Sequence, residues 1–237
     1  MVGPKMAAPP KAQRVPFTPP PAPPTLEEVL EKGLTQPDLL IRFVDAHPDR
    51  FTRPDTPPDV VKILAPMLLR VNRTFEAEQM LAAGVKAAPD NGELQLSWGR
   101  VLLALGRRPA AIKALEQATR LLPDQAEAHF ALARAYLERR PYDDALLQKS
   151  ISTFERTLEI APSFKSTDGA TAADLYFEIG MAYARMSRRT KETAQGMKSA
   201  WEQSLALDPD FKPQSNPEVD ARQIRQVVAD LERQIAE

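Results

Sequence analysis

The 237-residue sequence contains no cysteine, which excludes disulfide bonds, thiolate metal sites and anchors acylated on cysteine. It has only two histidines, His47 and His129, and neither is accompanied by a base, a nucleophile or a second metal ligand at a recognised spacing. Its nine glycines form no phosphate-binding loop. These absences predict a protein that is not an enzyme and has no metal or cofactor site.

Long hydrophobic runs and an excess charge are also missing. No apolar stretch approaches the roughly 20 residues that cross a bilayer, and the first residues lack the apolar core of a secretory signal. Lysine and arginine number 31 against 32 aspartate and glutamate, a net charge of −1 that gives no bias toward nucleic acid. We therefore expect a cytoplasmic protein without a membrane span and with nucleic acid disfavoured as a partner. The oligomeric state stays open.

Proline, by contrast, is abundant at the start of the chain. Nine of the 23 prolines fall within residues 1–24, where few side chains could build a core. Proline fixes φ and removes backbone donors, so this composition predicts a disordered, proline-rich tail. The segments Pro16–Pro19 and Pro20–Pro23 fit a loose PxxP pattern, which leaves two interpretations open: a solvated spacer, or a ligand for an aromatic groove.

Downstream of the tail, small and bulky apolar residues recur at fixed offsets that end in a proline. The clearest copy, residues 92–125, has them at Trp98, Gly99, Leu102, Gly106, Ala111, Leu115, Ala118 and Pro123. This spacing resembles the tetratricopeptide repeat, a unit of two helices with fixed small positions and a closing proline. The resemblance implies an all-α, right-handed α-solenoid of helix-turn-helix repeats that leaves a concave surface for partners.

The same register divides the rest of the chain. We expect repeats at 58–91, 92–125, 126–164 and 173–211, a helical hairpin that caps the array at 25–57, and a C-terminal capping helix within 212–237. The last two repeats carry about five extra residues, which predicts second helices longer by more than one turn. Gly99 and Gly180 are expected where the two helices of a hairpin approach closely.

The resemblance also implies which side chains face the concave groove. They are Leu96, Arg100, Leu103, Phe130, Arg134, Leu137, Phe177, Met181 and Arg185. We expect Leu96, Phe130 and Phe177 to form an apolar track beside Arg100 and Arg134, suited to a protein segment with apolar anchors and carboxylates. Alternatively, the tail or a neighbouring helix covers them. The hypothesis for function is a non-enzymatic adaptor or scaffold that mediates assembly of a protein complex.

Arginine pairs recur in the turns within the repeats and predict a basic edge. They are Arg107 and Arg108, Arg139 and Arg140, and Arg188 and Arg189. Cations at such turns complement helix C-termini, which accounts for them without a ligand. The alternative hypothesis is a structural assembly subunit that docks an acidic protein or an anionic surface through this edge. No aromatic stacking platform accompanies the arginines, which disfavours nucleic acid.

Overall fold

The computed structural model describes residues 21–236, with the exception of residue 34 and residues 50–55. In this part of the chain eleven α-helices follow one another, and the β-structure is limited to an isolated bridge between Lys165 and Thr171. The helices are α1 (Leu26–Lys32), α2 (Pro37–Ala46), α3 (Pro58–Arg70), α4 (Thr74–Ala87), α5 (Gly92–Ala104), α6 (Arg108–Leu121), α7 (Ala126–Leu137), α8 (Asp144–Ile160), α9 (Ala172–Arg185), α10 (Lys191–Leu207) and α11 (Ala221–Ala236). The predicted all-α solenoid is confirmed.

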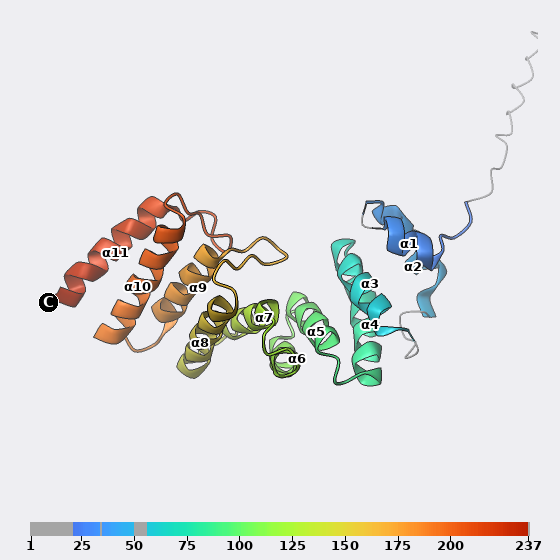
Figure 1. The fold of residues 1–237 in the computed structure, drawn as a ribbon, viewed down its shortest axis with the longest axis horizontal. Helices are drawn as coiled ribbons and strands as arrows, with labels where there is room; N and C mark the ends of the chain where they lie inside the picture. Colours follow the sequence, from blue (N-terminus) through green and yellow to red (C-terminus); the bar gives the residue numbers. More distant parts are fainter. Residues whose placement is uncertain (1–20, 34, 50–55, 237) are drawn as a thin grey trace, which may run out of the picture.

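The helices pair as hairpins that stack into an open arch (Figure 1). Each hairpin from α3 to α10 packs its two helices together and contacts the next hairpin along the chain. In addition, α3 contacts α5, and α5 contacts α7, so the first helices of successive hairpins lie together on the inner side of the arch. Such an array buries a continuous core between layers and leaves a hollow inner wall.

Glycine allows the two helices of a hairpin to approach closely, as predicted for Gly99 and Gly180. A Cβ on Gly99 would lie 2.4 Å from Cγ of Leu115, and one on Gly180 would lie 2.2 Å from Nε1 of Trp201. Trp201 also donates a hydrogen bond from Nε1 to the Phe177 carbonyl oxygen, at 3.1 Å, one turn before Gly180. The absent side chain is therefore what admits the indole ring between α9 and α10.

The extra residues of the later repeats are distributed differently from the prediction. Helices α8 and α10 each have 17 residues, against 14 in α4 and α6, so each gains less than one turn. The remaining extra residues lengthen the connection that precedes each helix. In the first case Asp143 sets the start of α8, because its carboxylate accepts hydrogen bonds from the Ala145 and Leu146 amides.

The structure also shows how the segments at the two ends of the array pack against their neighbours. Residues 1–20 of the predicted tail lie outside the described residues. Residues 21–24 are described: Arg42 of α2 donates hydrogen bonds to the carbonyl oxygens of Pro21 and Ala22, and Pro24 is buried. At the other end α11 packs on α10 and buries Ile224 and other residues of its apolar stripe. Within the described ranges, none of the helices is long and apolar enough to cross a membrane.

Candidate functional site

The inner wall formed by α5, α7 and α9 holds two adjacent cavities. One, of about 360 Å³, lies between α5 and α7, and the other, of about 280 Å³, lies between α7 and α9. Both are lined by Phe130, Arg134 and Glu138 of α7 and by Asp168 of the α8–α9 loop, which we define as residues 161–171. Three side chains one turn apart on α7 thus join the two cavities into a single groove.

The apolar track expected along this wall is not open to solvent. Leu96, Phe130 and Phe177 are only 4%, 3% and 2% exposed. The Phe130 ring lies 5.0 Å from that of Phe164, and the Phe177 ring lies 5.9 Å from that of Phe211. These three side chains are therefore buried and not open to the groove. Phe164 and Phe211, from the segments that follow α8 and α10, pack on Phe130 and Phe177, whereas Leu96 is buried among side chains of α6 and α7.

The other predicted groove residues have mixed exposure. Leu137 is buried, whereas Leu103 and Met181 remain partly exposed. Leu103 lines the cavity between α5 and α7, whereas Arg185 lines the cavity between α7 and α9. The open part of the groove is consequently more polar than the sequence pattern indicated.

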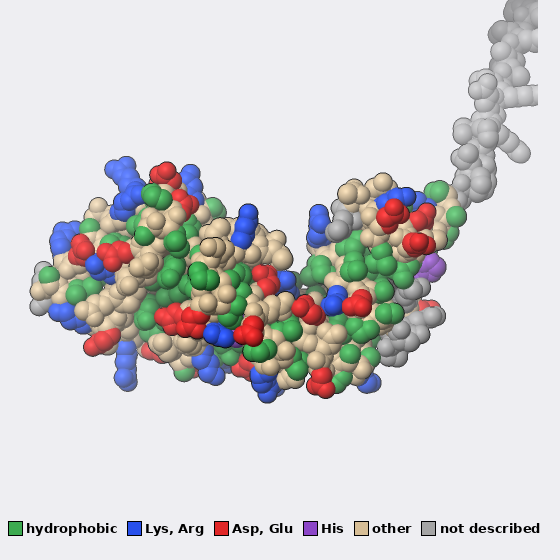
Figure 2. Space-filling view, viewed as in Figure 1, with side chains coloured by type: hydrophobic (Ala, Val, Ile, Leu, Met, Phe, Trp, Pro, Cys, Tyr) green, Lys and Arg blue, Asp and Glu red, His purple; other side chains and the backbone are tan. Residues whose placement is uncertain are grey.

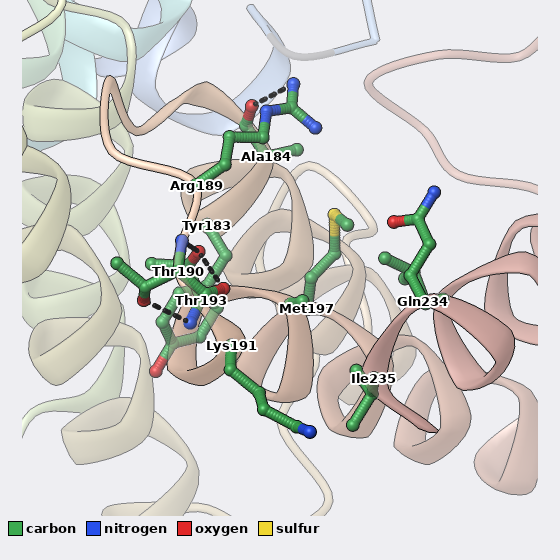
Figure 3. Close-up of a pocket in the computed structure, with 11 residues that line it drawn as sticks. Tyr183, Ala184, Arg189, Thr190, Lys191, Thr193, Met197, Gln234 and Ile235 are labelled. Carbon is green, nitrogen blue, oxygen red and sulfur yellow. Dashed lines mark hydrogen bonds between the residues drawn. The ribbon is translucent and has the colours of Figure 1, made fainter. Parts of the chain in front are cut away.

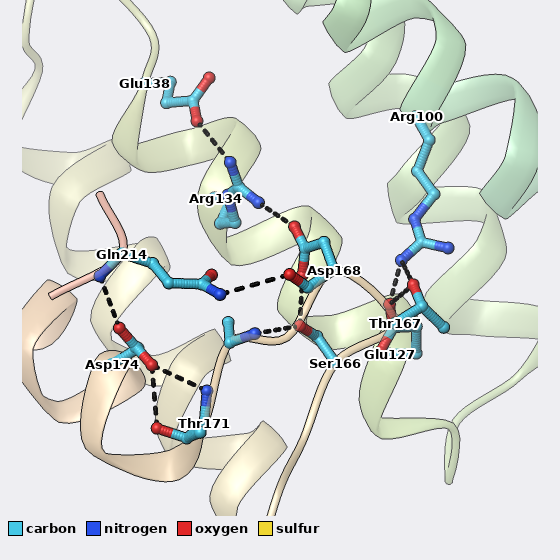
Figure 4. Close-up of polar contacts among 11 residues, drawn as sticks. Arg100, Glu127, Arg134, Glu138, Ser166, Thr167, Asp168, Thr171, Asp174 and Gln214 are labelled. Carbon is cyan, nitrogen blue, oxygen red and sulfur yellow. Dashed lines mark hydrogen bonds and ion pairs between the residues drawn. The ribbon is translucent and has the colours of Figure 1, made fainter. Parts of the chain in front are cut away.

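The α8–α9 loop reaches into the groove and engages both arginines predicted to bind a partner (Figure 4). Arg134 donates a hydrogen bond from Nη1 to Oδ2 of Asp168, at 2.9 Å. Arg100 pairs with Glu127 and donates a hydrogen bond from Nη2 to Oγ1 of Thr167, at 3.1 Å. Both guanidinium groups therefore have partners within the chain, and carboxylates of a partner protein would have to exchange with these contacts.

A compact turn holds the tip of this loop in place. Ser166 donates its amide to the Ala170 carbonyl at 2.8 Å, and Gly169 adopts φ +96°, which favours glycine. Gln214 donates from Nε2 to the Asp168 carbonyl oxygen at 3.3 Å. Burial alone would raise the pKa of Asp168, but the hydrogen bond from Ser166 and the charge of Arg134 hold that pKa below its ordinary value. Asp168 is thus ionised in its pair with Arg134.

Carboxylates outnumber cations around the cavity between α7 and α9. Its lining includes Glu138, Asp168, Asp174 and Glu178, against Arg134 and Arg185. Burial raises the pKa of Glu178, although a hydrogen bond with Ser215 and the charges of Arg185 and Arg134 oppose the shift. Within the described part of the chain no cluster of three or more histidines, aspartates or glutamates is arranged to hold a metal ion. The excess of acids favours a ligand that carries positive charge.

A third cavity, of about 370 Å³, lies between α9, α10 and the end of α11 (Figure 3). Tyr183, Met197 and Leu231 line it together with Arg189 and Lys191. Sequence analysis missed this cavity because it depends on how α11 packs against α10. Only the apolar stripe of α11 indicated that contact, and such a stripe does not specify the relative axial position of two packed helices.

The structure divides the predicted basic edge into two parts. Arg107 pairs with Glu78, and Arg108 lies 4.0 Å from Glu138, so these two arginines have carboxylate partners. The four arginines of the later turns are all exposed, and they are Arg139, Arg140, Arg188 and Arg189. The cationic part of the edge is therefore confined to the C-terminal half of the solenoid.

Comparison with known proteins identifies the repeats. Residues 96–151 match the model of the tetratricopeptide repeat family. No curated protein matches the sequence. Among solved structures, the chain is similar to the MamA protein, with 19% identity over 78% of this chain and 90% of that one and a TM-score of 0.56.

Two further solved structures have the same fold. MamA from Desulfovibrio magneticus RS-1 is 16% identical over 78% of this chain and 93% of that chain, with a TM-score of 0.57. YrrB, described as a TPR protein with an unusual peptide-binding site, is 19% identical over 78% of this chain and 79% of that chain, with a TM-score of 0.54. At these identities the likeness concerns the fold.

Proposed function

Because this chain carries tetratricopeptide repeats and folds as a solenoid of that family's kind, we propose that it is a non-enzymatic scaffold for protein–protein interaction. The groove of α5, α7 and α9 binds an extended segment of a partner protein and so mediates assembly of a complex. One observation carries this proposal. Two cavities that share Phe130, Arg134, Glu138 and Asp168 run without interruption along the inner wall.

The groove offers specificity chiefly through polar contacts. Its apolar residues are largely buried, whereas Arg134, Glu138 and Asp168 remain between about two-fifths and one-half exposed at their side chains. Exchangeable ion pairs of this kind contribute little to folding stability and are open to competition by charged groups of a ligand. A partner segment binds by exchanging these contacts while small apolar side chains enter the two cavities.

The test uses a substitution that fills the groove without disturbing the core. Phe130→Ala is unsuitable because truncating so buried a ring costs about 3–5 kcal/mol. Ala104 is exposed and lines the cavity between α5 and α7, so Ala104→Arg places a long side chain in the groove. The matched control is Ala82→Arg, at an exposed position within α4 that lines neither groove cavity.

We expect affinity capture followed by mass spectrometry to recover the same partner with the wild type and with Ala82→Arg, and to lose it with Ala104→Arg. Titration of the purified partner should then give at least about a tenfold weaker Kd for Ala104→Arg, the equivalent of 1.4 kcal/mol. Equal binding by both variants would show that the groove is not the site.

A second candidate function uses the exposed arginines instead. Arg139 and Arg140 precede α8, while Arg188 and Arg189 precede α10. Arg140 and Arg185 also place their guanidinium groups 4.9 and 5.3 Å from the centre of the Tyr142 ring. This cluster supports docking of an acidic protein or an anionic surface.

A further inference from the structure

The acidic cavity between α7 and α9 lacks a matching set of cations. Arg134 is engaged with Asp168 at 2.9 Å and lies 3.5 Å from Glu138, which Arg108 also approaches at 4.0 Å, so the cations near this cavity are already paired with Asp168 and Glu138. Arg185, the other cation, also stacks over Tyr142. Glu178 and Asp174 have hydrogen-bond partners, but in the described part of the chain neither has a cation within ion-pair distance. The cavity can therefore accept further positive charge.

The first 20 residues of the chain have the complementary charge. They contain Lys5, Lys11 and Arg14 and no aspartate or glutamate. The same segment supplies Val15 and Phe17 as apolar groups next to these cations. Its many prolines restrict the backbone, which lowers the entropy lost when such a segment is bound in an extended form.

The point of attachment lets this segment reach the cavity. The described chain begins at Pro21, which Arg42 holds against α2 at one end of the arch (Figure 1). Twenty residues in a polyproline II conformation span about 60 Å. Four steps of about 10 Å separate α1 from α9 along the first helices of the hairpins, a distance of about 40 Å. Lys5, which is 16 residues before Pro21, can therefore reach the cavity at about 50 Å, whereas Lys11 and Arg14 reach only about 31 and 22 Å along the inner wall.

We propose that residues 1–20 of this chain occupy its own groove and place Lys5 among Glu138, Asp168, Asp174 and Glu178. This rests on the proposed function, because it makes the N-terminal segment an internal ligand of the same groove. A partner protein then binds in competition with it. Burial raises the pKa of Glu178 in the open cavity, and a lysine or arginine beside it favours the ionised carboxylate.

The experiment exploits the absence of native cysteine. A nitroxide on Ala8→Cys of the full chain reports, by paramagnetic broadening of amide signals, which helices lie close to the segment. We expect most of the intensity to be lost at the inner ends of α7 and α9. The loss should disappear in 1 M salt, where the Debye length falls to about 3 Å, and in a chain that also carries Lys5→Glu, Lys11→Glu and Arg14→Glu.

Two controls make the outcome decisive. Glu178→Gln should weaken the broadening, whereas Glu202→Gln on the exposed side of α10 should not. Nitroxide-labelled chain mixed with isotope-labelled chain that lacks the nitroxide should show no broadening, and broadening there would assign the segment to a second copy instead. Absence of broadening on α7 and α9, or broadening that survives charge reversal, overturns the inference. Capture that is lost with Ala104→Arg would in that case still uphold the groove as a binding site.

Discussion

At the scale of single residues, a few glycines determine how closely the two helices of a hairpin can approach each other. Gly180 allows Trp201 to lie against the α9 backbone and to donate to the Phe177 carbonyl at 3.1 Å. Gly84 of α4 is different, because a Cβ there would meet Cγ1 of Val61 at 3.4 Å, an ordinary contact. Two helical glycines in one fold therefore have opposite tolerance for a methyl group.

This contrast gives a matched pair of substitutions. Gly180→Ala should destabilise the protein by about 1–2 kcal/mol, because overpacking against Trp201 outweighs the gain in helix propensity. Gly84→Ala should stabilise it by up to about 1 kcal/mol. Urea unfolding followed by tryptophan fluorescence measures both changes. Equal effects of the two substitutions would show that backbone propensity, and not the contact with Trp201, governs the position.

A second residue-scale prediction concerns pH. Burial raises the pKa of Glu178 above its ordinary value of 4.5, so folding favours its protonated form. The resulting stability is fully present below the ordinary value and is lost as pH rises through the raised pKa. Glu178→Gln keeps an uncharged side chain at every pH. In 1 M salt, where the proposed contact with residues 1–20 is screened, it should therefore gain stability relative to the wild type as the pH rises above 4.5.

Urea unfolding at a series of pH values measures this difference in the free energy of unfolding. Glu202→Gln is the control, because Glu202 is exposed and pairs with Lys198 at 2.9 Å. An offset between Glu178→Gln and the wild type that stays constant with pH would contradict the assignment of a raised pKa to Glu178.

At the scale of elements, the sequence predicts the helices well and their connections poorly. The position of Gly99 against Leu115 follows from the repeat pattern, because each such position has one packing role in every copy. The α8–α9 loop has no counterpart in the pattern. Its contacts join Thr167 with Arg100 and Asp168 with Arg134 over separations of 67 and 34 residues, and no local rule specifies such pairs.

Because the repeat pattern says nothing about connecting segments, it also fails to predict that Phe130 and Phe177 are buried. Phe130 and Phe177 occupy positions that face a concave surface in this repeat, and the pattern alone predicts them exposed. Phe164 and Phe211 cover them from outside the repeated positions. The sequence allows the tail or a neighbouring helix to cover these positions, but its repeat pattern does not identify the two connecting segments.

At the scale of the whole molecule, charge is separated although the total nearly cancels. Carboxylates gather in the cavity between α7 and α9, whereas the four exposed arginines lie at the turns before α8 and α10. Figure 2 shows acidic and basic side chains distributed over both arms of the arch around its central notch. The two proposed surfaces therefore select partners of opposite charge.

The basic edge can be tested by charge reversal at Arg139, Arg140, Arg188 and Arg189. Binding to polyglutamate or to vesicles of anionic phospholipid should fall steeply with salt in the wild type, because exposed charges are screened. The charge-reversed variant should show no binding to polyglutamate or to the vesicles at any salt concentration. The control reverses four exposed lysines and arginines elsewhere, which are Lys86, Lys113, Arg120 and Lys149. Equal loss in both variants would indicate a response to net charge alone.

In a solenoid each hairpin touches only its neighbours, so the curvature of the array is soft. The α8–α9 loop departs from this rule, because Thr167 and Asp168 bond to α5 and α7 while Gln214 holds the loop from the far side. It links the first helices of two successive hairpins to the segment that follows α10. We expect amide hydrogen exchange to be faster in α1 to α4, which lack such a link within the described residues, than in α5 to α10.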